Sequence, residues 1–364
     1  MKTLAALLFS AFLITPLTAF ADSFDKVRFL DAVENGDDAY LQEVFAGPHR
    51  EEAIRYHDSH GHTPIDYALL RTTPLYAFDS LLLLIRTGMQ PGSANASPGL
   101  ILARQIACGD LPERIDPAAL NEKLPGGMTP FLWACALADP STIRRFIDAG
   151  ADLYKNAGMD EDPDENALVI AAALSRYPEV IDLLLKHGMD VESTSSIGMG
   201  ALTVACVFNE LPAVAQALIR AGADVRRTDG VSGTPFQYAA RHAYALPLLR
   251  ELAARGADVF ACDDAGYSAM HEAARNNPNP EVLPYLLSLG LPLEPAVGRK
   301  LEEEEFTPMM LAARHNPSPD VIRAMIAARG DLERKDSEGH AAFEGLSKER
   351  AAWLREVGLG SYVR

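Results

Sequence analysis

A short motif, Thr-Pro followed by apolar residues and Ala, recurs along this chain of 364 residues. It reads Thr-Pro-Phe-Gln-Tyr-Ala-Ala at residues 234–240, and close copies begin at Thr63, Thr129 and Thr307. Weaker copies begin at residues 166, 200 and 268, so successive copies from 166 to 268 are 34 residues apart, and 63 to 129 is twice 33. A fixed period of this length predicts a solenoid, in which each unit buries its apolar face only against its neighbours.

A second motif closes most of the units. Gly-Ala-Asp followed by Leu or Val stands at residues 150–153, 222–225 and 256–259, and Gly-Met-Asp-Val stands at 188–191. Together the two motifs resemble the ankyrin repeat family, whose pattern is Gly-x-Thr-Pro-Leu-His-x-Ala-Ala, a second helix and Gly-Ala-Asp-Val. The resemblance covers nearly the whole chain after about residue 25. It implies an all-α solenoid of helix-turn-helix units with finger loops, about nine units including the caps, and it leaves the partner open.

The first 21 residues predict a secretory signal peptide. Lys2 supplies a positive start, residues 4–14 form an apolar core, and the small-x-small sequence at 19–21 predicts cleavage after Ala21. The apolar core is too short to span a membrane, and no other run of about 18 apolar residues occurs. We therefore expect export to the periplasm and no insertion into a membrane, with secretion from the cell as the alternative.

The mature chain is expected to be one ankyrin repeat domain. The units place an N-terminal cap at 22–55, repeats at 56–335 and a C-terminal cap at 336–364. Residues 89–126 form a degenerate unit, in which Ser97 and Pro98 replace the Thr-Pro pair and the closing Gly-Ala-Asp is missing.

Proline and glycine predict where the helices begin and end. Thr caps the first helix of a unit and Pro takes its first position, where the missing N–H costs nothing. The second helices are expected to begin at Pro178, Pro212, Pro280 and Pro319. Gly in a left-handed conformation is expected to end each second helix. In one unit Arg329 stands at that position and Gly330 follows, which predicts a helix that ends one residue late.

The chain is strongly acidic. It holds 33 Lys and Arg against 50 Asp and Glu, and removal of Lys2 leaves a net charge of −18. Such a surface repels nucleic acid and anionic lipid and favours a basic protein partner. The alternative interpretation is that the charge serves only solubility. We expect a monomer.

Four cysteines in an exported chain raise the question of disulfides. Cys135 and Cys206 occupy the same inward position two units apart, about 20 Å at the spacing of packed helices, which is too far for a bridge. They are interpreted as small core residues. A bridge between Cys108 and Cys135 of neighbouring units is left open, and no disulfide network is predicted.

The resemblance implies binding through the finger tips and the concave face of the first helices. Alignment to the repeat places these partner-binding candidates there: His57, His60, His62, Met128, Met199, Tyr267, Phe306 and His340. Val231, Asp264 and Ser337 align with the same tips. Exposed apolar and aromatic side chains at such positions are what a protein-binding surface requires, and Met128, Tyr267 and Phe306 carry the hypothesis.

Two polar clusters were weighed as metal sites. His57, His60 and His62 share one finger with Asp58, but an extended finger splays the imidazoles apart. Alternating acids at residues 160–164 look like the start of an EF-hand loop, yet Glu165 stands at the glycine position and Ala171 at the position of the last ligand. We predict no metal and no cofactor, and interpret the acids as a solvated insertion or a docking patch.

No catalytic motif is present: the chain holds no Gly-x-Ser-x-Gly, His-Glu-x-x-His or phosphate-binding glycine loop. His271 is the His of the repeat motif and is expected to bond to neighbouring fingers. The sequence therefore predicts a non-enzymatic protein-protein interaction scaffold in the periplasm. The resemblance permits a role as an accessory factor, since some periplasmic ankyrin proteins are linked to catalase, or as an inhibitor or immunity protein against a toxic effector. The alternative is a secreted effector that binds a host protein.

Overall fold

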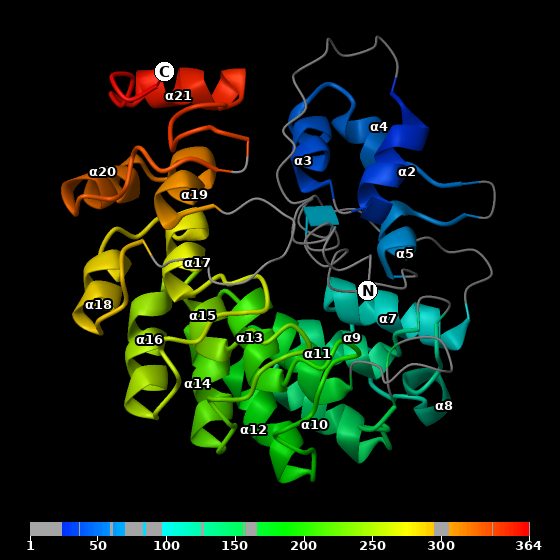
Figure 1. Cartoon of the computed structure of the whole chain (residues 1–364). Helices are drawn as coiled ribbons and strands as arrows, with labels where there is room; N and C mark the ends of the chain where they lie inside the picture. Colours follow the sequence, from blue (N-terminus) through cyan, green and yellow to red (C-terminus); the bar gives the residue numbers. More distant parts are fainter. Residues whose placement is uncertain are drawn as a thin grey trace.

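The computed structural model describes residues 24–35, 37–58, 61–69, 83–84, 97–124, 127–155, 157, 166–294, 306–336 and 338–363. Helices account for the regular structure of these residues, and only two isolated β-bridges join neighbouring strands of single fingers within them. Figure 1 shows the helix pairs stacked side by side in a strongly curved array, and between residues 98 and 327 the first helix of each pair lies on the inner side and the second helix on the outer side. The predicted all-α solenoid is confirmed.

The inner helices are α2 (Lys26–Asn35), α5 (Pro64–Leu69), α7 (Pro98–Cys108), α9 (Pro130–Leu137), α11 (Ala167–Leu174), α13 (Ala201–Phe208), α15 (Pro235–Ala239), α17 (Ala269–Asn276) and α19 (Pro308–His315). The outer helices are α3 (Asp38–Ala46), α8 (Pro117–Leu120), α10 (Pro140–Asp148), α12 (Pro178–Lys186), α14 (Pro212–Arg220), α16 (Ala245–Ala254), α18 (Val282–Ser288) and α20 (Pro319–Ala327). A short α4 (Arg50–Ile54) follows the N-terminal pair, and α21 (Lys348–Glu356) ends the array.

The inner helices begin as the motif predicts. The hydroxyl of Thr129 accepts the backbone N–H of Leu132 at 3.2 Å, and Thr234 and Thr307 cap α15 and α19 in the same way. Ser97 caps α7 by the same bond, so the worn motif of the degenerate unit still starts a helix. In the C-terminal unit the motif fails, because residues 341–345 form turns and α21 is the only helix that follows.

One predicted helix start is wrong. Outer helices begin at Pro178, Pro212 and Pro319 as expected, but α18 begins at Val282 and not at Pro280. The reason is Pro284, which has no N–H to donate to the carbonyl of residue 280 and is tolerated only in the first turn of a helix. Starting the helix at Val282 puts Pro284 in that turn.

The predicted end of α20 is also wrong. Five outer helices are followed by a Gly with φ between 86° and 96°, for example Gly150. Arg329 adopts this left-handed conformation itself, with φ 64°, so α20 ends at the usual position. Gly330 has another role: a Cβ there would lie 3.0 Å from Met309 Sδ and 3.2 Å from the carbonyl oxygen of Met325. The glycine is needed for a close approach of α19 and α20.

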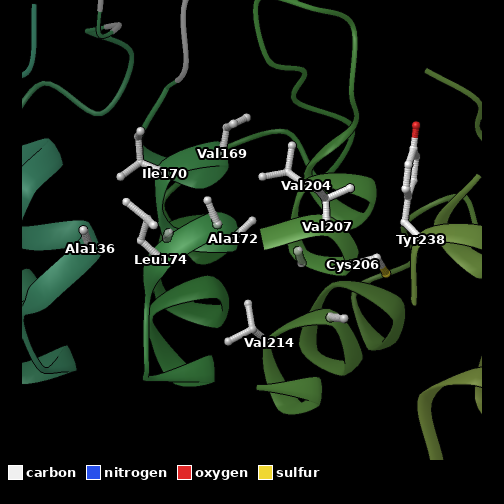
Figure 2. Packing of buried hydrophobic residues seen from close by; sticks show 14 of the residues in the cluster. Ala136, Val169, Ile170, Ala172, Leu174, Val204, Cys206, Val207, Val214 and Tyr238 are labelled. Carbon is white, nitrogen blue, oxygen red and sulfur yellow. The ribbon is translucent and has the colours of Figure 1, made fainter. Parts of the chain in front are cut away.

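The core runs without a break from unit to unit. Every residue of α11 is buried, and Figure 2 shows its side chains, including Ile170 and Leu174, between those of α9 and α13. Cys135 and Cys206 lie in this core as predicted, and the structure has all four cysteines as free thiols. Burial raises the pKa of Cys206 to about 12. The Cys108–Cys135 bridge is not formed, and Cys108 is exposed.

Side-chain amides tie consecutive units together where inner and outer helices meet. Asn209 donates to the carbonyls of Ala172 and Ser175, Asn277 to those of Ala240 and His242, and Asn316 to those of Ala274 and Asn277, at 2.7–3.1 Å. His242 Nε2 lies 2.8 Å from the carbonyl oxygen of Cys206. Each of these four units therefore satisfies helix-end carbonyls of the unit before it, which would otherwise lack intrahelical partners.

Candidate protein-binding surface

The finger loops share one turn. The backbone N–H of Asp229 donates to the carbonyl of Gly233 at 3.0 Å, and the Asp229 carboxylate accepts the N–H of Gly233 at 2.8 Å. Asp58, Asp263 and Asp336 make the same pair of bonds four residues apart, and the Ser195 hydroxyl replaces the carboxylate in one finger. The residue four places after the acid is thus on the returning strand, and the tip is formed by the first and second residues after it.

This geometry corrects two predicted binding residues. Met128 is fully buried and Met199 is only 7% exposed, so the prediction that they are exposed at finger tips is wrong. Met199 lies four residues after Ser195, on the returning strand, and Met128 lies at the same place in its own finger. Both side chains belong to the hydrophobic core.

The predicted aromatic residues are half-buried. Tyr267 packs edge-on against His271, with 5.1 Å between ring centroids. Phe306 lies under the guanidinium of Arg314, whose Cζ is 4.5 Å from the ring centroid, and Arg314 pairs with Asp336 at 2.7 Å. The Tyr267 ring thus packs within its own unit, whereas Phe306 supports an arginine that reaches the next finger, and the role of both rings in partner binding stays a prediction.

The predicted histidines that the structure describes, His57, His62 and His340, do not form a cluster. His57 is exposed, whereas His62 is half-buried with Nδ1 3.2 Å from the Asp58 carboxylate. His340 lies at the far end of the array, 3.4 Å from Glu338. Within the described ranges no three His, Cys, Asp or Glu side chains gather as metal ligands, while His60, Ser337 and the acids at 160–165 lie outside those ranges.

Among the described residues, which leave out 295–305 of the next finger, His271 makes no hydrogen bond to a neighbouring finger. Its Nδ1 accepts the backbone N–H of Ser268 at 3.0 Å within its own unit, and burial lowers its pKa to about 4. Nε2 is buried and has no hydrogen-bond partner among the described residues. Gln237 makes the expected contact one unit earlier, because its side-chain amide donates to the carbonyl of Tyr267 in the next finger at 2.8 Å.

Among the finger tips that the structure describes, Ile197 and Val231 are the exposed apolar residues. They occupy the same position on adjacent fingers, two residues after the turn-forming Ser195 and Asp229, and they are 38% and 43% exposed. Val231 was among the aligned tip residues, and Ile197 was missed, although the same spacing marks it in the sequence. On the inner helices, Val27 of α2, Ile101 of α7 and Phe208 at the C-terminal end of α13 are exposed apolar side chains.

Contacts between fingers hold these tips in place. A Cβ on Gly230 would lie 3.2 Å from the carbonyl oxygen of Ile197, so the two fingers touch. The next finger donates the backbone N–H of Asp264 to the carbonyl of Val231 at 3.0 Å, and Asp264 accepts the hydroxyl of Ser232 at 2.7 Å. A surface fixed in this way loses little conformational entropy when it binds.

Ionisable groups lie behind the tips. Asp263 accepts the N–H groups of Ala265 and Tyr267 and lies 3.3 Å from the Gln237 amide, and burial raises the pKa of its carboxyl to about 6. The Tyr238 hydroxyl donates to Asp229 at 2.7 Å, and burial raises its pKa. These groups support the turns from within.

Comparison with known proteins decides the family. The model described as "Ankyrin repeats (3 copies)" matches residues 131–229, 202–297 and 236–336, which together span more than half of the chain. The chain belongs to the ankyrin repeat family. As an ankyrin repeat protein it is a scaffold for protein-protein interactions.

Solved structures give one further likeness. The ankyrin repeat domain of human ASB11 is similar at 17% sequence identity and a TM-score of 0.48, over 65% of this chain and 96% of that chain. No curated protein matches the ankyrin repeat chain. Among the residues that the structure describes, no helix combines the length and the apolar character that crossing a membrane requires.

Proposed function

We propose that the protein is exported to the periplasm and acts there as a non-enzymatic scaffold that binds one protein partner. The interface consists of the finger tips and the inner helices. Its role is that of an accessory factor for an exported protein or of an inhibitor that neutralises a toxic one. The observation that carries the proposal is the pair Ile197 and Val231, which stand exposed on adjacent fingers that approach closely at Gly230.

The electrostatics favour a protein over other partners. The net charge of −17 opposes contact with nucleic acid and with anionic membrane surfaces. Apolar tips surrounded by polar turns are typical of a protein interface, in which a few apolar anchors supply most of the affinity. The sequence of residues 1–21 supports export.

The test is a pull-down from periplasmic extract with the tagged mature chain, which starts at Asp22, followed by mass spectrometry. We expect one partner in stoichiometric amount, and we expect the Ile197→Ser/Val231→Ser variant to lose it. Val27→Ser, at an exposed position of α2 in the N-terminal cap, is the matched control and should retain the partner. Retention of the partner by the tip variant would show that the interface lies elsewhere.

The same experiment separates the two roles. An accessory factor captures a protein from the periplasm of its own cell under normal growth. An inhibitor yields an empty pull-down there and captures a protein only from extracts of competing cells. Accumulation of the mature chain in culture supernatant instead of the periplasm would contradict both roles and support a secreted effector.

A further inference from the structure

A second exposed apolar feature lies away from the fingers. The residue just before each outer helix stands in the turn between the two helices of a unit, at the end of the pair opposite the finger. Along the array this position is held by Asp116, Asp139, Tyr177, Leu211, Tyr244, Glu281 and Ser318. Three consecutive units thus carry large apolar side chains where the units on either side carry acids. We call Tyr177, Leu211 and Tyr244 the turn row.

The side chains of the turn row are exposed to solvent and do not cap the helices that follow them. Tyr177, Leu211 and Tyr244 are 38%, 41% and 68% exposed. At the same position Asp139 caps α10, with its carboxylate 2.8 Å from the N–H of Ser141. The structure shows no side-chain cap bond from any residue of the turn row to the described helix that follows it. Because the fold would be better served by a capping residue, these side chains point to binding.

The spacing and the charge of the turn row define its partner. Stacked helices lie about 8–10 Å apart, and seven residues of an α-helix rise about 10.5 Å. Apolar residues at every seventh position of a helix therefore match the three units. The surrounding charge is mainly acidic: Asp139 and Glu281 flank the row, and Glu179 and Glu210 are exposed beside it, against Arg176 and the partly exposed Arg241. Burial lowers the pKa of the neighbouring His242, which adds no positive charge at neutral pH.

We propose that the turn row docks a basic amphipathic helix of another protein, which lies along the array with an apolar residue over each of Tyr177, Leu211 and Tyr244. A shallow hollow between the last two units, lined by Leu211, His242 and Tyr244 among others, lies beside the row. This surface is separate from the finger tips, so the protein presents two interfaces and can bridge two partners.

The probe is a synthetic 21-residue peptide with Leu at the first and fourth positions of three heptads and Lys on its polar face. Binding to the mature chain is followed by fluorescence anisotropy. We expect the Tyr177→Ser/Leu211→Ser/Tyr244→Ser variant to bind the peptide at least tenfold more weakly than the wild type does. A scrambled peptide of the same composition should bind the wild type just as weakly. Absence of binding to the wild type, or equal binding of the scrambled peptide, would overturn the proposal.

Two further variants separate docking from folding and from the finger tips. Tyr177→Asn and Leu211→Asn place a capping residue on backbone that already has extended cap geometry, so they should raise the midpoint of thermal unfolding while weakening the peptide. The tip variant Ile197→Ser/Val231→Ser should bind the peptide as the wild type does. A loss confined to the tip variant, or a loss of the same size in Phe260→Ser on another exposed surface, would contradict docking on the turn row.

Discussion

The guanidinium of Arg350 donates a hydrogen bond of 2.7 Å to the backbone carbonyl of Asn316, and Asn316 in turn donates to the carbonyl of Asn277 at 2.9 Å. Arg350 also reaches the carbonyls of Ala312 and Ala313, at 3.1 and 2.8 Å. The C-terminal cap thus uses one arginine where the repeats use an asparagine, and the chain of contacts between units continues to the end of the array.

Replacing Arg350 by Ala should therefore destabilise the C-terminal units. The change removes three charge-assisted bonds and leaves the carbonyls of Ala312, Ala313 and Asn316 without them, at a cost of about 2–3 kcal/mol. Urea unfolding and hydrogen exchange of α19 and α20 measure the effect. Arg355→Ala, on an exposed position of α21, is the control and should change little. Equal losses of stability from Arg350→Ala and Arg355→Ala would show that the changes act only through helix propensity or net charge.

Arg329→Gly should stabilise the protein. Arg329 holds φ 64°, a conformation that costs an L-residue about 1 kcal/mol and costs glycine almost nothing. The free energy of unfolding should rise by about that amount, as read from the urea midpoint. Ser232→Gly relieves a similar φ of 65° but removes the hydroxyl bond to Asp264, so its gain should be smaller. A loss of stability in Arg329→Gly would mean that the arginine side chain contributes more than its backbone costs.

The buried pair Asp66 and Arg104 should couple α5 to α7. Arg104 Nε donates to the Asp66 carboxylate, which also accepts the N–H of Thr63 at 2.7 Å, and both side chains are almost fully buried. Arg104→Met alone leaves a buried carboxylate uncompensated and should cost about 3–5 kcal/mol. The double variant with Asp66→Leu should recover much of that loss. Denaturant unfolding of the wild type, both single variants and the double variant gives the coupling, and simple additivity would contradict it.

Stability should depend on pH through Asp263. Its folded-state pKa is about 6, above the unfolded value near 3.8, so the folded protein binds this proton more tightly. The contribution is fully present below about pH 4 and is lost as pH rises through 6. Relative to an Asp263→Asn variant, the wild type should lose about 2 kcal/mol at most between pH 4 and pH 7. Unfolding free energies of both proteins at several pH values provide the test, and a difference that is constant or of opposite sign would contradict the burial of this carboxyl.

Structural features that neighbouring residues determine could be predicted from the sequence, whereas features that depend on packing between units could not. The unit period, the Thr129 cap and the Gly150 turn follow from short-range geometry, and the structure agrees with them. The start of α18 could also have been predicted correctly, because Pro284 in the sequence excludes a start at Pro280. The burial of Met128 and Met199 could not be predicted from the sequence, because it depends on how each returning strand packs against its neighbours. The position of the exposed tips follows once the turn is known to be closed by Ser195 and Asp229.

The measurement that tests the central claim most directly is site-specific photo-crosslinking in living cells. A photoreactive phenylalanine analogue is placed at position 197 or 231 on the finger tips, or at the exposed position 182 in the middle of α12 on the outer side. The account predicts one discrete adduct of the same mass from both tip positions and none from position 182. Adducts from position 182 alone, or no adduct from either tip in cells that contain the partner, would contradict it.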